Sequence, residues 1–461
     1  MPLLVALLAL AFPLQASDTA LVAAERSAHA ALVRDGGRLW HARLDTIPWL
    51  AVDAAGKRVS LSADPGLTGY TRVGDGLWVG PLPPGITPAN TSIEWAGRRW
   101  AMIVLPLPSD SAARTRLLVH EVWHVVQPAV LPLPAVREGS AGAALLDEPE
   151  GRTWLQLEWR ALADALDGMA TPGVPRERVT RALERALLFR ARRYLAAAPE
   201  ERDRERLLDM SEGLAEYTAW RLTGGDPRAL AHEVRGAPAA LSTFVRGFPY
   251  YMGPAYAMAL DWLRRGASWT SELRGTPDLQ RLVARSLPTR DDRPVEAWLL
   301  AAERGAPDAL ARRLRAAAER EGASYDLASL RAAESARWHE HEQRLAALRA
   351  TFVDGPTLRI VPGSLAITFD PRAQIALGAA GTVMPGLAWK TADGASLSAP
   401  AGALVSTDWS ELRVPLDTLA LAAGTLDSAR TWHAAGWTLT LPRGWVLVRD
   451  GHSWVARPPA R

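Results

Sequence analysis

Two histidines four residues apart carry the clearest chemical signal in this sequence. His120 is the first and His124 the last residue of the run HEVWH, and Glu121 follows the first histidine. On a helix, side chains four residues apart lie on one face, a turn apart, so both imidazoles could bind one tetrahedral Zn²⁺. Glu121 could accept a proton from a metal-activated water without being a ligand itself. The run therefore predicts two metal ligands and a general base for hydrolysis.

Such a site needs a third protein ligand, and the sequence offers two acidic candidates. Metzincins use a histidine six residues beyond the second one, but Val130 occupies that position, so this group is excluded. Glu158 lies in an apolar and aromatic stretch. Glu212 begins the run EGLAEY, in which Glu216 is one turn further along the same helical face. Residue types alone leave Glu158 and Glu212 both open.

The HEVWH and SEGLAEY runs together resemble the gluzincin metallopeptidases, which include thermolysin and the aminopeptidase N group. In those enzymes a glutamate from a downstream helix completes an HExxH zinc site, and the aminopeptidases carry it in an Asn-Glu-Gly-Phe-Ala run. The resemblance implies that His120, His124 and Glu212 bind Zn²⁺ and that Glu121 is the base. It also implies that Glu216 holds a zinc histidine by a hydrogen bond.

A tyrosine is the second catalytic candidate. Tyr250 lies in a Pro-Tyr-x-x-Gly run at residues 249–253, which is similar to the run that carries the oxyanion-stabilising tyrosine of aminopeptidase-like gluzincins. Such a hydroxyl donates a hydrogen bond where negative charge develops. Tyr251 and Tyr256 are alternatives. The resemblance also implies that an edge strand, placed at residues 98–105, binds the substrate backbone by strand addition.

The spacing of the two metal motifs departs from the gluzincin pattern. These enzymes commonly place the glutamate much closer to the second histidine, whereas 87 residues separate His124 from Glu212 here. We therefore expect an insertion with two helices, at 153–166 and 176–197, that loops out and returns. Because of this insertion, Glu158 stays an alternative ligand.

The pattern of apolar residues and turn signals predicts an α+β fold in three parts. We expect a β-rich N-terminal part at 17–108, a mainly helical, zincin-like catalytic domain at 109–352 and a C-terminal β domain at 356–461. Ser109-Asp110 is an N-cap signal for the motif helix, and Pro128 is expected to end it after Gln127. The strands expected in the first part are 39–44, 49–52, 77–79, 91–95 and 98–105.

The first sixteen residues predict export. Residues 1–16 are apolar, too short to span a bilayer comfortably, and end in Leu-Gln-Ala, a small-residue cleavage pattern. We interpret them as a cleaved signal peptide, with no membrane span after its removal. The chain has no cysteine, so disulfides are excluded. A periplasmic or extracellular location is expected.

Charge and composition argue against nucleic-acid binding. The formal net charge is +3, from 53 basic and 50 acidic residues. Basic residues alternate with acidic ones, as at 201–206, which is typical of ion-paired helix faces rather than a phosphate-binding stripe.

The sequence thus predicts an exported zinc metallopeptidase that hydrolyses a peptide or protein. One alternative is a cell-surface binding or scaffold protein with a structural or inactive zinc site. Another is a zinc hydrolase for a non-peptide amide or ester. Glu121 favours an enzyme, because a site that had lost catalysis would not need that carboxylate.

Overall fold

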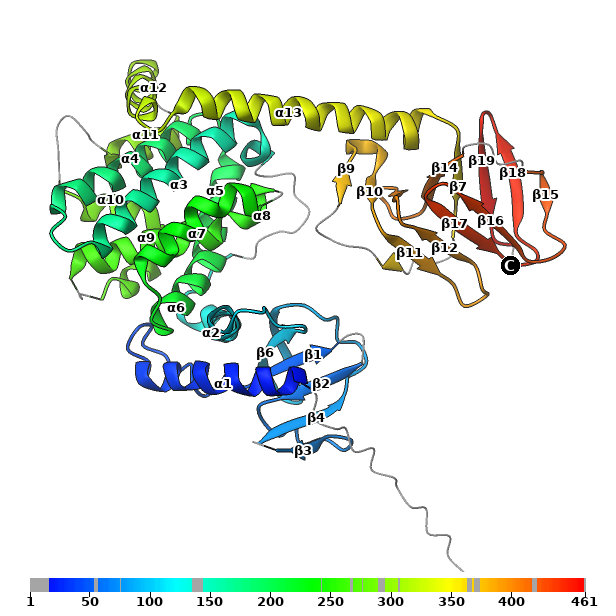
Figure 1. The fold of residues 1–461 in the computed structure, drawn as a ribbon, viewed down its shortest axis with the longest axis horizontal. Helices are drawn as coiled ribbons and strands as arrows, with labels where there is room; N and C mark the ends of the chain where they lie inside the picture. The colour runs from blue at the N-terminus through cyan, green and yellow to red at the C-terminus, as the bar shows by residue number, and fades with distance from the viewer. Residues whose placement is uncertain are drawn as a thin grey trace, which may run out of the picture. The chain divides into compact units, whose positions relative to one another are not determined.

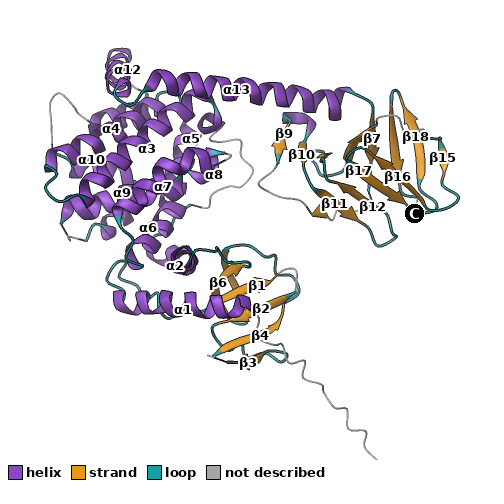
Figure 2. Ribbon diagram, viewed as in Figure 1, coloured by secondary structure: helices purple, strands orange, loops and turns teal. Residues whose placement is uncertain are grey.

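The computed structural model confirms the α+β class: an N-terminal sheet, a mainly helical centre and a C-terminal β-rich part (Figure 2). The described residues are 16–53, 57–74, 76–134, 144–241, 243–265, 268–275, 277–288, 295–305, 307–362, 367–368, 374–416 and 421–459. Residues 1–15, which hold nearly all of the expected signal peptide, lie outside them. The chain forms two compact units, one up to Glu334 and one from Ser335 (Figure 1).

A six-stranded sheet begins the first unit. Its order is β3-β4-β2-β1-β6-β5, and only the pair β1–β6 is parallel. Its strands are β1 (Trp49–Asp53), β2 (Arg58–Leu61), β3 (Thr71–Val73), β4 (Leu77–Pro81), β5 (Thr91–Trp95) and β6 (Arg98–Val104). Ala96 and Gly97, both at positive φ, form the tight turn that folds β6 back on β5.

This topology corrects the choice of edge strand. The strand expected at 98–105 to bind substrate is β6, and it lies inside the sheet between β1 and β5. The edge is β5, because the hairpin turn places it on the outer side of β6. An incoming strand could therefore pair only with β5 at this side of the sheet.

Helices form the rest of the first unit. They are α1 (Ala16–Asp35), α2 (Ser111–Val130), α3 (Pro149–Ala170), α4 (Arg176–Tyr194), α5 (Pro199–Leu208), α6 (Leu214–Leu222), α7 (Pro227–Ala240), α8 (Phe244–Gly247), α9 (Pro249–Arg264), α10 (Leu279–Ser286), α11 (Val295–Arg304), α12 (Asp308–Ala323) and α13 (Leu327–Arg349). One hydrophobic core runs from α1 through the sheet to α13. Within it α2 packs against β6 on one side and α6 on another.

Two local expectations were wrong. Residues 39–44 form turns rather than a strand, because Gly36, Gly37 and His41 take positive φ values that interrupt an extended chain. Pro128 does not end the motif helix, which continues to Val130. A proline inside a helix removes one N–H donor and crowds the carbonyl four residues earlier, but Pro128 lies in the last turn, where only two further residues follow.

The second unit is a β structure with its own core. An eight-stranded sheet has the order β15-β18-β19-β7-β14-β13-β10-β9, and a five-stranded sheet has the order β16-β17-β12-β11-β8. The strands are β7 (Thr357–Ile360), β8 (Ile367–Thr368), β9 (Ile375–Ala376), β10 (Thr382–Met384), β11 (Leu387–Lys390), β12 (Ser396–Ala399), β13 (Ala403–Val405), β14 (Leu412–Pro415), β15 (Gly424–Thr425), β16 (Arg430–Ala434), β17 (Trp437–Leu441), β18 (Val446–Asp450) and β19 (Ser453–Arg457).

The end of α13 belongs to this second unit. Its residues Leu345 and Leu348 pack with Phe352 against the buried Val383 and Leu404. The unit is therefore longer than the expected β domain at 356–461. Among the described residues, no helix is long and apolar enough to span a membrane.

Candidate metal centre

The metal motif lies on α2, which is anchored at both its start and its middle. The Asp110 side chain accepts a hydrogen bond from the Ala113 N–H at 2.7 Å and so caps the helix. Trp123, between the two histidines in the motif, is fully buried and stacks on Trp40 with ring centroids 4.3 Å apart. The Trp40 indole N–H donates to Thr218 on α6 at 2.9 Å. These contacts fix α2 against α6.

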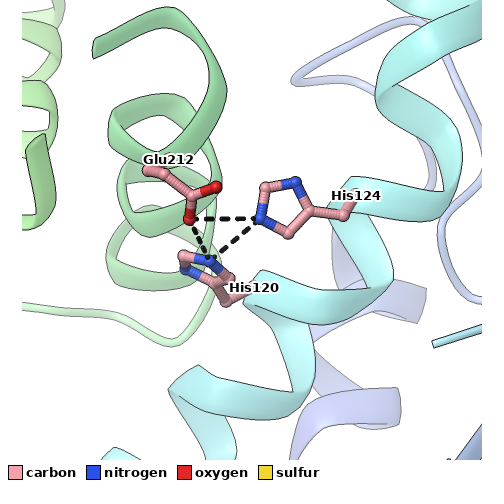
Figure 3. A group of neighbouring side chains, drawn as sticks. All are labelled: His120, His124 and Glu212. Carbon is pink, nitrogen blue, oxygen red and sulfur yellow. Dashed lines mark hydrogen bonds and ion pairs between the residues drawn. The ribbon is translucent and has the colours of Figure 1, made fainter. Parts of the chain in front are cut away.

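The structure brings His120, His124 and Glu212 together (Figure 3). Their ligand atoms form a small triangle. The two histidine Nε2 atoms are 3.1 Å apart, and Glu212 Oε2 lies 3.4 Å from Nε2 of His120 and 3.5 Å from Nε2 of His124. The predicted ligand set thus converges from two helical segments that are far apart in the sequence.

This triangle fits a zinc ion. Two ligand atoms that each lie about 2.0–2.1 Å from a tetrahedral zinc are about 3.3–3.4 Å apart. The three observed separations, 3.1, 3.4 and 3.5 Å, are close to that value. Two imidazole nitrogens and one carboxylate oxygen also form a ligand set that catalytic zinc sites use, with a fourth position left for water or substrate.

Glu212 is presented by an irregular turn of helix. Residues Asp209–Gly213, between α5 and α6, form a π-helical turn. Such turns insert an extra residue into a helix and occur often at functional sites. The Gln127 side-chain amide donates to the carbonyl of Met210 at 2.9 Å, so α2 holds this turn directly. The residue pattern of this segment gave no sign of the turn.

Glycines set the distance between this turn and α9. A Cβ atom on Gly253 would lie 2.1 Å from the Cα of Gly213, and a Cβ on Gly213 would lie 2.8 Å from the Cα of Gly253. Neither position could hold a larger residue without separating the two segments. The close approach places Tyr250, one turn before Gly253, beside Glu212.

The outer nitrogens of both histidines have partners. His120 Nδ1 lies 3.0 Å from Oε2 of Glu216, and His124 Nδ1 lies 3.1 Å from Oε1 of Gln127. Because carboxylate and amide oxygens accept here, each Nδ1 donates and each Nε2 is left free to bind a metal. Glu216 thus takes the position that was predicted for it. Gln127 was missed, although its spacing of three residues from His124 places it on the same helical face.

Tyr250 lies at the metal centre, whereas the two alternative tyrosines do not. The Tyr250 hydroxyl donates to Glu212 Oε2 at 2.8 Å, and its ring stacks on His120 with centroids 5.6 Å apart. Tyr251 packs instead against Trp159, and the buried Tyr256 hydroxyl donates to Glu158 at 2.6 Å.

Glu158, the alternative ligand, belongs to a buried ion-pair cluster and not to the metal centre. One oxygen accepts from Arg190 Nε at 2.8 Å and the other from Arg193 Nη2 at 2.9 Å. Arg190 also donates to Asp209 at 2.8 Å. Arg190 therefore links the cluster to the π-helical turn through Asp209. Both Glu158 oxygens accept hydrogen bonds from arginines, so Glu158 is not placed to bind a metal.

The charges at the centre favour a cation between the ligands. Burial alone would raise the pKa of Glu212, but His120 and His124 lower it overall. Burial alone would lower the pKa of His120, but Glu212 and Glu216 raise it to about 10. The raised pKa of His120 means that the carboxylates stabilise positive charge on its ring, and the lowered pKa of Glu212 means that the histidines stabilise the negative charge of its carboxylate.

Glu121 has a different environment from the ligands. Its side chain is buried, and burial raises its pKa. Its Oε2 atom has no hydrogen-bond partner within the described part of the chain. A buried carboxylate oxygen is costly when it has no hydrogen-bond partner. We therefore expect this oxygen to contact a group that does not belong to the described residues.

Two cavities adjoin the ligands and share Ser211, Glu212 and Tyr250. The first, of about 580 Å³, is lined by the edge strand β5 through Thr91 and Ser92 and also by the motif histidines. The second, of about 540 Å³, is lined by the end of α2 and by α5. A ligand that reaches the metal centre could thus extend into both.

In comparisons with known proteins, the sequence matches no protein-family model, no curated protein and no solved structure. The resemblance to gluzincins therefore rests on the motif residues of the sequence alone.

Proposed function

We propose that this protein is an exported, zinc-dependent metallopeptidase. The observation that carries the proposal is the buried Glu121 carboxylate. The Oε2 atom of this carboxylate has no hydrogen-bond partner among the described residues. In the sequence, Glu121 directly follows His120, one of the three candidate ligands whose spacing fits zinc. A binding or scaffold protein needs a closed site and no such carboxylate, so the geometry supports hydrolysis.

Each side chain has a definite task in peptide hydrolysis. His120, His124 and Glu212 would hold zinc, which activates water and polarises a carbonyl when it is bound. Glu121 accepts the proton of the attacking water and passes it to the leaving amine. Tyr250, whose hydroxyl lies at hydrogen-bond distance from Glu212, can turn to donate to the developing oxyanion.

The substrate backbone is proposed to pair with β5. This strand is the free edge of the sheet and lines the same cavity as His120, Glu121 and His124. Strand addition binds a peptide through its main chain, so it would hold a scissile bond beside the ligands with little dependence on side chains. A peptide or protein substrate follows from this arrangement.

Cleavage of a mixed peptide library by the zinc-loaded protein tests the proposal. We expect cleavage that a chelator abolishes and added zinc restores. Glu121→Gln should keep the zinc and lose about 10²–10⁴-fold in rate, because only the proton acceptor is removed. Failure to cleave any peptide would contradict the proposal, as would wild-type rates in Glu121→Gln.

A further inference from the structure

The second cavity at the metal centre has a composition of its own. It shares Ser211, Glu212 and Tyr250 with the cavity beside β5, so a substrate bound at the ligands has direct access to it. Its walls are mainly apolar and come from the end of α2, the segment after it and α5. The apolar lining residues include Pro128, Leu131, Leu133, Leu207 and Leu208.

Two arginines add positive charge to these apolar walls. Arg204 lies on α5 and Arg246 on α8, and both line the cavity. Arg246 is exposed and has no hydrogen-bond or ion-pair partner among the residues that the structure describes. Glu212 is the cavity's acidic lining residue, and its Oε2 atom already contacts Tyr250 and both histidines. The positive charge of Arg246 is therefore available to a ligand, and Arg204 adds to the positive potential of the same cavity.

The cavity beside β5 has the opposite character. Glu121, Glu212 and Glu216 line it. Arg116 also lines it, but its guanidinium is 3.3 Å from Glu233 and lies over the ring of Trp220. Away from the two histidines and Glu212, the charges of this cavity are those of Glu121, Glu216 and the paired Arg116, so a substrate carboxylate is favoured in the other cavity.

We propose that the second cavity is a specificity subsite for an apolar side chain with a carboxylate close to it. Arg204 and Arg246 would bind the carboxylate, and the apolar walls would bind the side chain. The carboxylate could be the C-terminus of the peptide or an aspartate or glutamate side chain. This inference rests on the proposed peptidase function, and it gives the substrate a direction across the metal centre.

Binding of four matched peptides tests the inference. Each is a fluorescently labelled hexapeptide with one leucine followed by glutamate or glutamine, and each is made as a free acid and as a C-terminal amide. Binding is measured by anisotropy on zinc-loaded Glu121→Gln, which should not cleave them. We expect the peptides with a carboxylate to bind about tenfold more tightly than the glutamine amide. Comparison of the two singly charged peptides identifies the preferred carboxylate.

Charge-removing variants in the same background locate the interaction. Arg246→Gln and Arg204→Gln should each reduce the preference for a carboxylate to about threefold or less, and both together should abolish it. Arg206→Gln is the matched control. Arg206 also lies on α5, but it pairs with Asp203 and does not line the cavity, so its removal should leave the preference unchanged.

The outcomes separate this inference from the proposed function. Equal binding of charged and neutral peptides would overturn the subsite, and so would a preference that survives the double variant, while cleavage by the wild type would still support a peptidase. If the wild type cleaves none of the peptides in a library and the Glu121→Gln variant binds none of the four, the proposed function fails and the subsite fails with it.

Discussion

At the scale of single residues, Gln127 and Glu216 explain how the two histidines are aimed. Each contacts the Nδ1 atom of one imidazole and leaves Nε2 turned toward Glu212. Gln127 also holds the carbonyl of Met210, so one side chain links a histidine to the segment that carries the third ligand. Ligand orientation is thus built from groups that do not themselves reach the metal.

Glu216→Gln should weaken zinc binding by about 10–100-fold, because the amide is a poorer partner for the imidazole N–H than the carboxylate. Competition with a calibrated chelator measures the affinity. Glu233→Gln is a suitable control, since Glu233 pairs with Arg116 and does not contact the histidines. Unchanged affinity in Glu216→Gln would show that its contact with His120 does not orient the ligand.

Tyr250→Phe should lower kcat about 10–100-fold with little change in KM, since the hydroxyl would act mainly in the transition state. The ring can still stack on His120, so the fold should not change. Steady-state kinetics on a peptide substrate measure both constants. An increase in KM with kcat unchanged would assign the hydroxyl to substrate binding instead.

At the scale of elements, the sequence predicted the motif helix and the two strands β5 and β6, but neither which of these strands is the edge nor how the ligand segments meet. The spacing of His120 and His124 needs only one helix, so local periodicity was sufficient. Glu158 and Glu212 could not be separated, because the arginines that occupy Glu158 lie on α4, over thirty residues later. The π-helical turn was equally hidden, since its close approach to α9 at Gly213 and Gly253 joins segments forty residues apart.

Gly253→Ala tests that contact. The new Cβ would overlap the backbone of Gly213, so we expect a loss of about 1–3 kcal/mol in the free energy of unfolding. Zinc affinity should fall as well, because Glu212 moves with the turn. Gly236→Ala on α7 is the control: nothing lies within 4 Å of its Cβ, and it should be neutral or slightly stabilising. Wild-type zinc affinity in Gly253→Ala would contradict this role for the glycine pair.

At the scale of the whole molecule, the three candidate metal ligands all lie in the first of two compact units. The two units have separate hydrophobic cores. A ligand that binds one folded unit stabilises that unit by mass action and leaves an independent one unchanged.

Calorimetry with and without a chelator should therefore show two unfolding transitions, of which only one moves. Zinc at a concentration about 100 times its Kd adds about 2.7 kcal/mol to the free energy of unfolding of the first unit. Removal of zinc should therefore lower the Tm of that unit by several degrees. The transition of the β unit should stay in place. A shift of both transitions would show that the units unfold together.

The most direct test of the central claim is the zinc content of the purified protein, measured by elemental analysis for the wild type, Glu212→Gln and Glu158→Gln. We predict about one zinc per chain in the wild type, loss of zinc in Glu212→Gln, and retention in Glu158→Gln, which should lose stability instead. Absence of zinc from the wild type after incubation with the metal would contradict the account. Retention of zinc in Glu212→Gln together with its loss in Glu158→Gln would show that Glu158, and not Glu212, is the third ligand.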